Sequence, residues 1–171
     1  MKLSTYHKSR GDNVTLIRPQ EIATLDQTPS DIIYISCIFV ENRDLAIELS
    51  RKFPNVLVGG SGIDLDNRLP PNIETLMPDY DLYPEMKYSL GFTTRGCIRS
   101  CDFCIVPKKE GTIQIVGDIY NFWNRKHKHV MLLDNNILAL PSHFEQICNQ
   151  IQIEKLTEPQ YLSSITILII S

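Results

Sequence analysis

Three cysteines within eight residues constrain the fold of this chain more than any other feature. The run from Cys97 to Cys104, with Cys101 between them, has the spacing C-x3-C-x2-C. Three thiolates this close on one loop can bind three corners of an iron–sulfur cube, while the run itself supplies no fourth ligand. The rest of the chain is therefore expected to be the scaffold that presents this loop.

The other two cysteines are predicted to be small buried hydrophobic residues. Cys37 lies in the apolar run 32–40, and Cys148 lies on the apolar face of a predicted helix. The N-terminus has no apolar signal sequence, which predicts a cytoplasmic protein, and disulfides are rare in that reducing compartment. Metal binding or catalysis is then the expected role of at least some of the five cysteines.

Composition excludes several classes of protein. The chain has 171 residues, of which 43% are hydrophobic, enough to bury the core of one or two domains. Its net charge of -3 gives no basic excess, so no nucleic-acid partner is indicated. The apolar segment 165–170 is far shorter than the ~20 residues that span a bilayer, so no membrane partner is expected.

The first half of the chain predicts a small parallel α/β domain. Val14–Arg18 is rich in β-forming residues, and Asp31–Val40 is expected to be a strand buried on both faces. Apolar residues recur at helical spacing between residues 41 and 53, and a second strand is expected at 55–58. A proline-rich connector follows at 64–85. We place the domain boundary at its end, which gives domains 1–85 and 86–171.

The segment 59–62, Gly-Gly-Ser-Gly, directly follows the second predicted strand. Its backbone amides could hold a phosphate or a cofactor tail at the end of the sheet. It could equally form a plain tight turn, since the full dinucleotide-binding fingerprint is absent. Both interpretations stay open at this point.

The second half predicts a repeat of strand, loop and helix. Tyr88–Arg95 is expected to be a strand that delivers the cysteine loop from its carboxyl end, where α/β folds usually build their sites. A second strand is predicted at 130–133, and Ser142–Glu145 has the sequence of a capping box that begins a helix. Another helix is expected from an apolar stripe formed by Ile115, Ile119, Phe122 and Trp123. The basic run 124–129 is interpreted as the solvated end of this helix.

Zinc is an alternative ligand for the cysteines. The C-x3-C-x2-C spacing differs from the paired C-x2-C knuckles of structural zinc sites, so a zinc-stabilised binding module would need a distant fourth ligand. The candidates for that ligand are His127, His129, Cys148 and Cys37.

The cysteine run resembles the signature of the radical S-adenosylmethionine (radical SAM) superfamily, including the aromatic residue Phe103 before the third cysteine. This resemblance implies that Cys97, Cys101 and Cys104 bind a 4Fe-4S cluster and that S-adenosylmethionine chelates its open iron. It implies reductive cleavage of the sulfonium to a deoxyadenosyl radical, which abstracts hydrogen from a substrate that the sequence does not identify. The implied partner is an electron donor such as a flavodoxin or a ferredoxin.

The same resemblance assigns further residues to the cofactor. Phe103 matches the aromatic residue that packs near the adenine. Asp134, Asn135 and Asn136 stand where many members have a Gly-Gly-Glu type segment that meets the methionyl amino group, although such residues also suit helix caps and turns. Candidates for stabilising the thiolates and the reduced cluster electrostatically are Arg95, Arg99, Lys108 and Lys109.

The first half resembles, more weakly, the cobalamin-binding-like domain that precedes the radical SAM core in one large subgroup. The resemblance rests on the strand-helix-strand order, on Ser36 late in a strand and on the glycine pair 59–60. It implies cobalamin as a candidate ligand. The signature D-x-H-x-x-G is absent around His7, because Thr5 and Arg10 stand at the aspartate and glycine positions.

The length of the second half limits what it can build. An eight-unit barrel takes about 250 residues, so the chain from residue 86 has room for about two to three strand-helix units. The predicted fold is a Rossmann-like parallel-sheet domain followed by the start of an incomplete radical SAM barrel, an N-terminal portion whose tail 161–171 is a third strand. Independent turnover is not expected from such a portion. The alternative function is a non-catalytic iron–sulfur or electron-transfer module.

Overall fold

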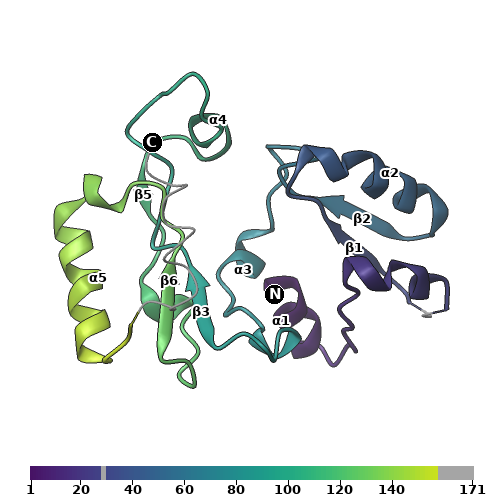
Figure 1. Cartoon of the computed structure of the whole chain (residues 1–171), viewed down its shortest axis with the longest axis horizontal. Helices are drawn as coiled ribbons and strands as arrows, with labels where there is room; N and C mark the ends of the chain where they lie inside the picture. Colours follow the sequence, from purple (N-terminus) through teal and green to yellow (C-terminus); the bar gives the residue numbers. More distant parts are fainter. Residues whose placement is uncertain (28–29, 158–171) are drawn as a thin grey trace. The chain divides into compact units, whose positions relative to one another are not determined.

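The computed structural model describes residues 1–27 and 30–157. It is a mixed α/β structure with three two-stranded sheets among these residues (Figure 1). The chain divides into two units. We call Thr15–Pro70 the inserted unit, and Met1–Val14 together with the chain from Pro71 onward the cysteine unit.

The inserted unit contains the predicted strand-helix-strand motif. Strands β1 (Ile33–Ser36) and β2 (Val56–Gly59) pair in parallel, and helix α2 (Arg43–Lys52) connects them. Short 3-10 helices lie at Pro19–Gln27 and Val40–Asn42. The order of these elements confirms the prediction of a small parallel sheet.

Two details of the prediction for this unit are wrong. Val14–Arg18 has no strand conformation. The strand β1 is shorter than the apolar run that contains it and is not buried on both faces, since the Tyr34 side chain is 41% exposed. Only one small helix connects β1 to its partner, so it does not have the two covered faces of a larger parallel sheet.

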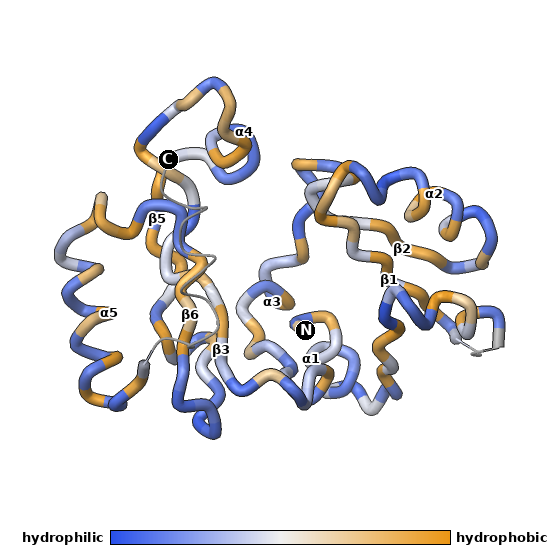
Figure 2. The backbone as a smooth tube through the Cα atoms, viewed as in Figure 1, coloured by the Kyte–Doolittle hydropathy of each residue, from blue (hydrophilic) through white to orange (hydrophobic). Residues whose placement is uncertain are grey.

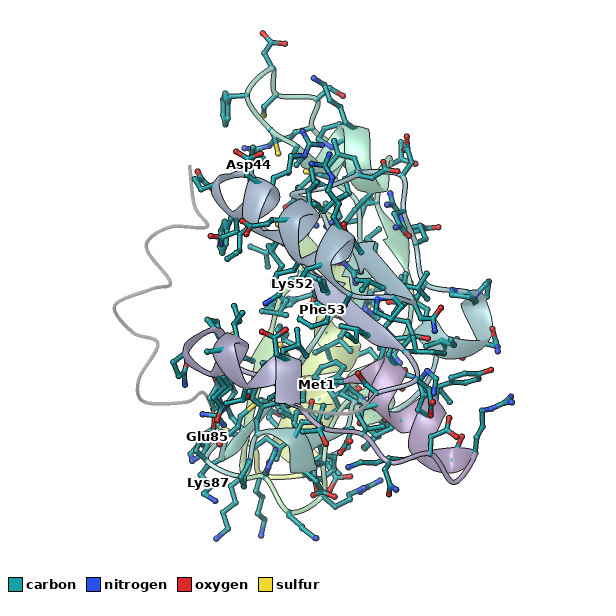
Figure 3. The ribbon with its side chains drawn as sticks, turned by 90° about the vertical axis from the view of Figure 1, so that its right-hand side faces the viewer. Met1, Asp44, Lys52, Phe53, Glu85 and Lys87 are labelled. Carbon is teal, nitrogen blue, oxygen red and sulfur yellow. The ribbon has the colours of Figure 1, made fainter. Side chains whose placement is uncertain are left out.

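Helix α2 follows the predicted amphipathic pattern. Ala46 is buried, and Pro54 lies two residues beyond the last helical residue, Lys52, where it prevents the helix from continuing. Asp44 in the first turn and Lys52 in the last turn complement the helix dipole, and Lys52 lies beside Phe53 (Figure 3). The strands β1 and β2 are mostly hydrophobic, whereas α2 alternates between hydrophilic and hydrophobic residues (Figure 2).

The glycine turn after β2 packs tightly against the end of β1. Gly60 has a φ of +102°, and a Cβ at this position would lie 2.3 Å from the Cys37 carbonyl oxygen. Gly62 donates its N–H to the same carbonyl at 3.0 Å. Close packing therefore accounts for these glycines. Cys37 is 4% exposed, which confirms its prediction as a buried hydrophobic residue.

The cysteine unit begins with helix α1 (Lys2–Ser9), which contacts the short helix α3 (Pro71–Glu74). Lys8 forms an ion pair of 2.8 Å with Asp79, and the Ser4 hydroxyl donates to the same carboxylate. These contacts join the chain start to the proline-rich connector. The predicted boundary after residue 85 therefore falls inside this unit.

The cysteine unit contains two small sheets. Strands β3 (Tyr88–Gly91) and β6 (His129–Leu132) pair in parallel, whereas β4 (Thr94–Arg95) and β5 (Gln114–Ile115) pair antiparallel. The remaining elements are the helices α4 (Val106–Glu110) and α5 (Pro141–Ile153) and 3-10 helices at Tyr80–Leu82, Ile119–Asn121 and Ile137–Ala139. The core of the unit consists of Ile119, Phe122, Trp123, Val130, Ile147 and Leu156.

Three expectations for the cysteine unit are corrected. The stripe 115–123 is not a helix but strand β5 followed by a 3-10 turn, in which Asp118 and Asn121 form a capping box. The basic run 124–129 therefore does not end a helix. Ser142 does not cap α5, because Pro141 is already its first helical residue.

The arrangement of β6 and α5 agrees with a strand-helix repeat. After α5, Thr157 makes a parallel bridge to His129 on β6. The described residues contain small parallel sheets and no closed barrel. The predicted third strand, 161–171, lies outside the described residues. In the part of the chain that is described, no helix has the length and apolar character needed to cross a membrane.

Candidate cluster-binding loop

The three clustered cysteines lie on one loop between β4 and α4. This loop, residues 96–105, is called the cluster loop, and it projects beyond the strands of the cysteine unit (Figure 1). All three cysteines carry free thiols of intermediate exposure. Cys104 donates its N–H to the Cys101 carbonyl at 3.0 Å, which forms a tight turn between these two ligand candidates. Phe103, between Cys101 and Cys104, has 83% of its surface exposed.

The start of the cluster loop is held by contacts with the residues that follow helix α4. Cys97 donates its N–H to the Gly111 carbonyl at 3.2 Å. Gly96 has a φ of +81°, and a Cβ there would lie 2.3 Å from the Thr112 carbonyl oxygen. Only glycine fits this position without displacing the neighbouring backbone.

The sulfur of Cys97 lies within reach of two N–H donors. The Arg99 backbone N–H lies 3.4 Å from Sγ, and the Asn136 side-chain amide lies 3.7 Å from it. Donors of this kind are typical of the surroundings of metal-bound thiolates. The spacing of the three free thiols on one loop suits an iron–sulfur cluster, but in the described structure the three side chains are not gathered around a common centre.

Glu110, which the sequence prediction missed, connects the loop to its surroundings. Its carboxylate is 11% exposed and accepts hydrogen bonds from Arg95 at 2.9 Å, from the Gly96 N–H at 3.0 Å and from the Asn135 amide at 2.9 Å. Burial acts to raise the pKa of Glu110, but the Gly96 hydrogen bond and the Arg95 charge outweigh it and bring the pKa below its usual range. The only sequence signal was an acid after two lysines and before a glycine.

The Asp134 carboxylate faces the strand that leads into the loop. It accepts hydrogen bonds from the backbone N–H groups and the hydroxyls of Thr93 and Thr94, with the two hydroxyls at 2.8 and 2.6 Å. Both threonines are fully buried. Internal contacts therefore account for this carboxylate, and its role toward a cofactor stays a prediction.

The three residues after β6 lie where the edge of a parallel sheet predicts. Asp134 binds Thr93 and Thr94, Asn135 binds Glu110, and Asn136 lies beside Cys97. The structure thus brings this segment to the base of the cluster loop. Phe103 is exposed, and no hydrogen bond among the described residues joins it to this segment.

The predicted cations divide into two groups. Arg95 stacks over the Phe92 ring at 3.5 Å. It also forms ion pairs with Glu110 and, at 3.6 Å, with Glu74, so these two carboxylates balance its positive charge. Lys108 and Lys109 lie in the last turn of α4, where they suit the helix dipole. Arg99 approaches Cys97 through its backbone N–H.

The histidines proposed as a fourth zinc ligand lie at the other end of the sheet. His129 is paired with Tyr88 at the start of β3, and the Ser89 hydroxyl contacts His127 at 3.0 Å. Cys37 is buried within the inserted unit, whereas Cys148 on α5 is only half buried, so the prediction that Cys148 is a buried residue is wrong. Across residues 1–27 and 30–157, no three His, Cys, Asp or Glu side chains lie close enough together to hold one metal ion.

Comparison of the chain with protein-family models, with curated proteins and with solved structures gave no match. We therefore base the function on the cysteine spacing and on the contacts around the cluster loop.

Proposed function

We propose that this chain binds a 4Fe-4S cluster through Cys97, Cys101 and Cys104 and leaves one iron open for S-adenosylmethionine. The observation that carries this proposal is the C-x3-C-x2-C spacing on a single projecting loop with free thiols. The loop follows β4, a short strand that continues the chain beyond the carboxyl end of β3, and parallel α/β folds usually bind their cofactors at that end of the sheet. The run offers three thiolates and no fourth.

The residues of the chain have separate tasks in this proposal. When bound, the cluster and S-adenosylmethionine supply one-electron chemistry that leads to hydrogen abstraction. Asn136 donates an N–H toward the Cys97 sulfur, which stabilises its thiolate form. Asp134 fixes Thr93 and Thr94, and thereby the strand that precedes the loop. Phe103 provides an exposed aromatic face for the adenine.

The proposal covers cofactor binding and not independent turnover. The described residues of the cysteine unit supply one parallel pair of strands, whereas a substrate cavity in a barrel is enclosed by several. An electron donor of the flavodoxin or ferredoxin type would reduce the cluster at the projecting loop. We assign no cobalamin to the inserted unit, because its glycine turn packs against residues 37–39.

Iron binding by cysteine variants tests the ligand set. After anaerobic reconstitution, the intact chain is expected to hold about four iron and four sulfide ions. Alanine at Cys97, Cys101 or Cys104 is expected to abolish stable cluster binding, because each change removes one of only three thiolates. Cys37→Ala and Cys148→Ala serve as matched controls and are expected to retain the iron.

Two results would contradict this assignment. Equal loss of iron across all five variants would show that the cysteines are wrongly divided into ligands and core residues. Recovery of stoichiometric zinc and no iron from anaerobically purified protein would exclude the iron–sulfur function altogether and favour the zinc module.

A further inference from the structure

We infer that Glu110 is a positioning residue of the cluster loop: it fixes the backbone at Gly96 and Cys97, where the loop begins, before any cluster is present. The inference rests on the proposed function where cluster retention is concerned. The claim that Glu110 fixes the start of the loop in the cluster-free chain does not depend on the proposed function, because it is argued from the hydrogen bonds of Glu110 alone.

Glu110 connects helix α4 with two other segments of the chain, Arg95–Gly96 and Asn135. Its Oε1 accepts from Arg95 on β4, and its Oε2 accepts both from the Gly96 N–H and from the side-chain amide of Asn135, which follows β6. Gly96 directly precedes Cys97. One nearly buried carboxylate therefore ties the entry of the cluster loop to the sheet and to the segment that also carries Asn136.

The base and the tip of the loop differ in how they are held. At the base, Gly96 and Cys97 have hydrogen bonds to Glu110 and Gly111, which lie 14 residues further along the chain. Toward the tip, the bond from Cys104 to Cys101 is local, and the apolar side chains are exposed, 63% for Ile98 and 83% for Phe103. The backbone at Cys97 is thus held by residues outside the loop, whereas the bond between Cys104 and Cys101 is local to it.

The chemistry of the contact suggests a specific variant. A glutamine at position 110 has nearly the same shape but only one acceptor oxygen. In either orientation its NH2 group faces a donor, which is Arg95 on one side and the Gly96 N–H and the Asn135 amide on the other. A hydrogen bond to a charged group is worth about 1.5–3 kcal/mol, so the loss weakens the clamp at least about tenfold.

The first test uses the cluster-free full chain and requires no cofactor. Amide hydrogen exchange of Gly96, measured by NMR, is expected to be at least about tenfold faster in Glu110→Gln than in the intact chain. Glu154→Gln is the matched control, since Glu154 pairs with Arg125 and Tyr120 in the same unit and is expected to leave Gly96 unchanged. Unchanged exchange at Gly96 in Glu110→Gln would overturn the inference.

The second test measures how firmly the cluster is held. Release of the reconstituted cluster to an iron chelator is expected to be about tenfold faster in Glu110→Gln, while Glu154→Gln retains it as the intact chain does. Faster exchange at Gly96 with unchanged cluster release would overturn the positioning role. If the intact chain takes up no cluster, the proposed function fails, and Gly96 exchange alone decides whether Glu110 fixes the loop.

A second variant covers the case in which Glu110→Gln does not fold. Asn135→Ala removes one donor and leaves the bonds from Arg95 and Gly96 in place. It is expected to shift Gly96 exchange and cluster release in the same direction by a smaller factor. Values equal to those of the intact chain in both measurements would then overturn the inference.

Discussion

The sequence allows two roles for Asp134, contact with a cofactor or formation of a cap or turn, and the structure shows its carboxylate bound to neighbouring residues of the chain. Its position after a strand resembles a cofactor-binding segment. In the structure its carboxylate accepts hydrogen bonds from the backbone and the hydroxyls of Thr93 and Thr94. The sequence predicted that Asp134 lies at the carboxyl edge of the sheet. It could not predict these partners, because they lie about 40 residues earlier in the chain.

Asp134→Asn is expected to lower the free energy of unfolding of the cluster-free chain by about 2 kcal/mol or more. The amide would have one acceptor oxygen in place of two and would lose the charge, in a site with buried hydroxyls. Urea denaturation monitored by circular dichroism measures the change. Asp102→Asn at the exposed loop tip is the control. Equal stability of the two variants would contradict the anchoring role of Asp134.

Gly96→Ala is expected to destabilise the chain by more than Gly11→Ala does. Both glycines have a positive φ, of +81° and +88°, so alanine costs about 1–2 kcal/mol at either position. At Gly96 the new methyl group would also overlap the Thr112 carbonyl, whereas nothing lies within 4 Å at Gly11. Thermal unfolding of the two variants compares them. An equal loss of thermal stability in the two variants would show that the surroundings of Gly96 are less closely packed than described.

At the scale of the elements, prediction succeeded where the signal was local. Helix α2 has apolar spacing, charges that suit its dipole and Pro54 beyond its end, and it was confirmed. The stripe 115–123 failed because its apolar residues do not belong to one element. Gly117 and Asp118 separate strand β5 from the 3-10 turn that carries Ile119. The stripe was also expected to be core, which holds for the buried residues Ile119, Phe122 and Trp123 and is wrong for Ile115, which is 57% exposed.

The predicted strand Tyr88–Arg95 is divided in two for a reason that the sequence does not show. The parallel ladder with β6 ends where Gly91 pairs with Leu132. Beyond it, the N–H groups of Thr93 and Thr94 donate to Asp134 instead of to a neighbouring strand. The second piece, β4, then pairs with β5, and this change of partner places the cluster loop at the edge of the unit.

The amino end of β3 carries a pH-sensitive contact. Burial, followed by the charge of Lys87, lowers the pKa of His127, whose ring also meets the edge of Tyr80 and the Ser89 hydroxyl. Because the folded-state pKa is below the unfolded value of 6.5, the unfolded chain binds more protons between the two values. This contribution to stability is therefore lost as the pH falls through 6.5 toward the folded-state pKa.

The expected result is a smaller dependence of stability on pH in His127→Gln. Urea unfolding of the intact chain and of this variant would be compared from about pH 7.5 to about pH 5.5. Asn149→Ala, at an exposed position of α5 without an ionisable group, is the control and is expected to keep the pH dependence of the intact chain. A slope in His127→Gln equal to that of the intact chain would contradict the assignment.

At the scale of the whole molecule, the order of elements was predictable and the division into units was not. Prolines and aspartates marked the segment 64–85 as an irregular connector with a domain boundary at its end. The structure assigns its second part to the cysteine unit, because α1 contacts α3 and Lys8 pairs with Asp79, more than 70 residues away. Such long-range pairs have no local sequence signal. For the same reason Glu110 was not recognised before the fold was known.

The central claim concerns an iron–sulfur cluster with an open coordination site, and electron paramagnetic resonance tests it most directly. The reconstituted full chain would be reduced anaerobically and measured with and without S-adenosylmethionine. We expect a signal of a reduced 4Fe-4S cluster whose shape changes when S-adenosylmethionine is added, because the cofactor takes the iron that the three thiolates leave free. A cluster signal that S-adenosylmethionine leaves unchanged would contradict the claim and favour a non-catalytic electron-transfer module.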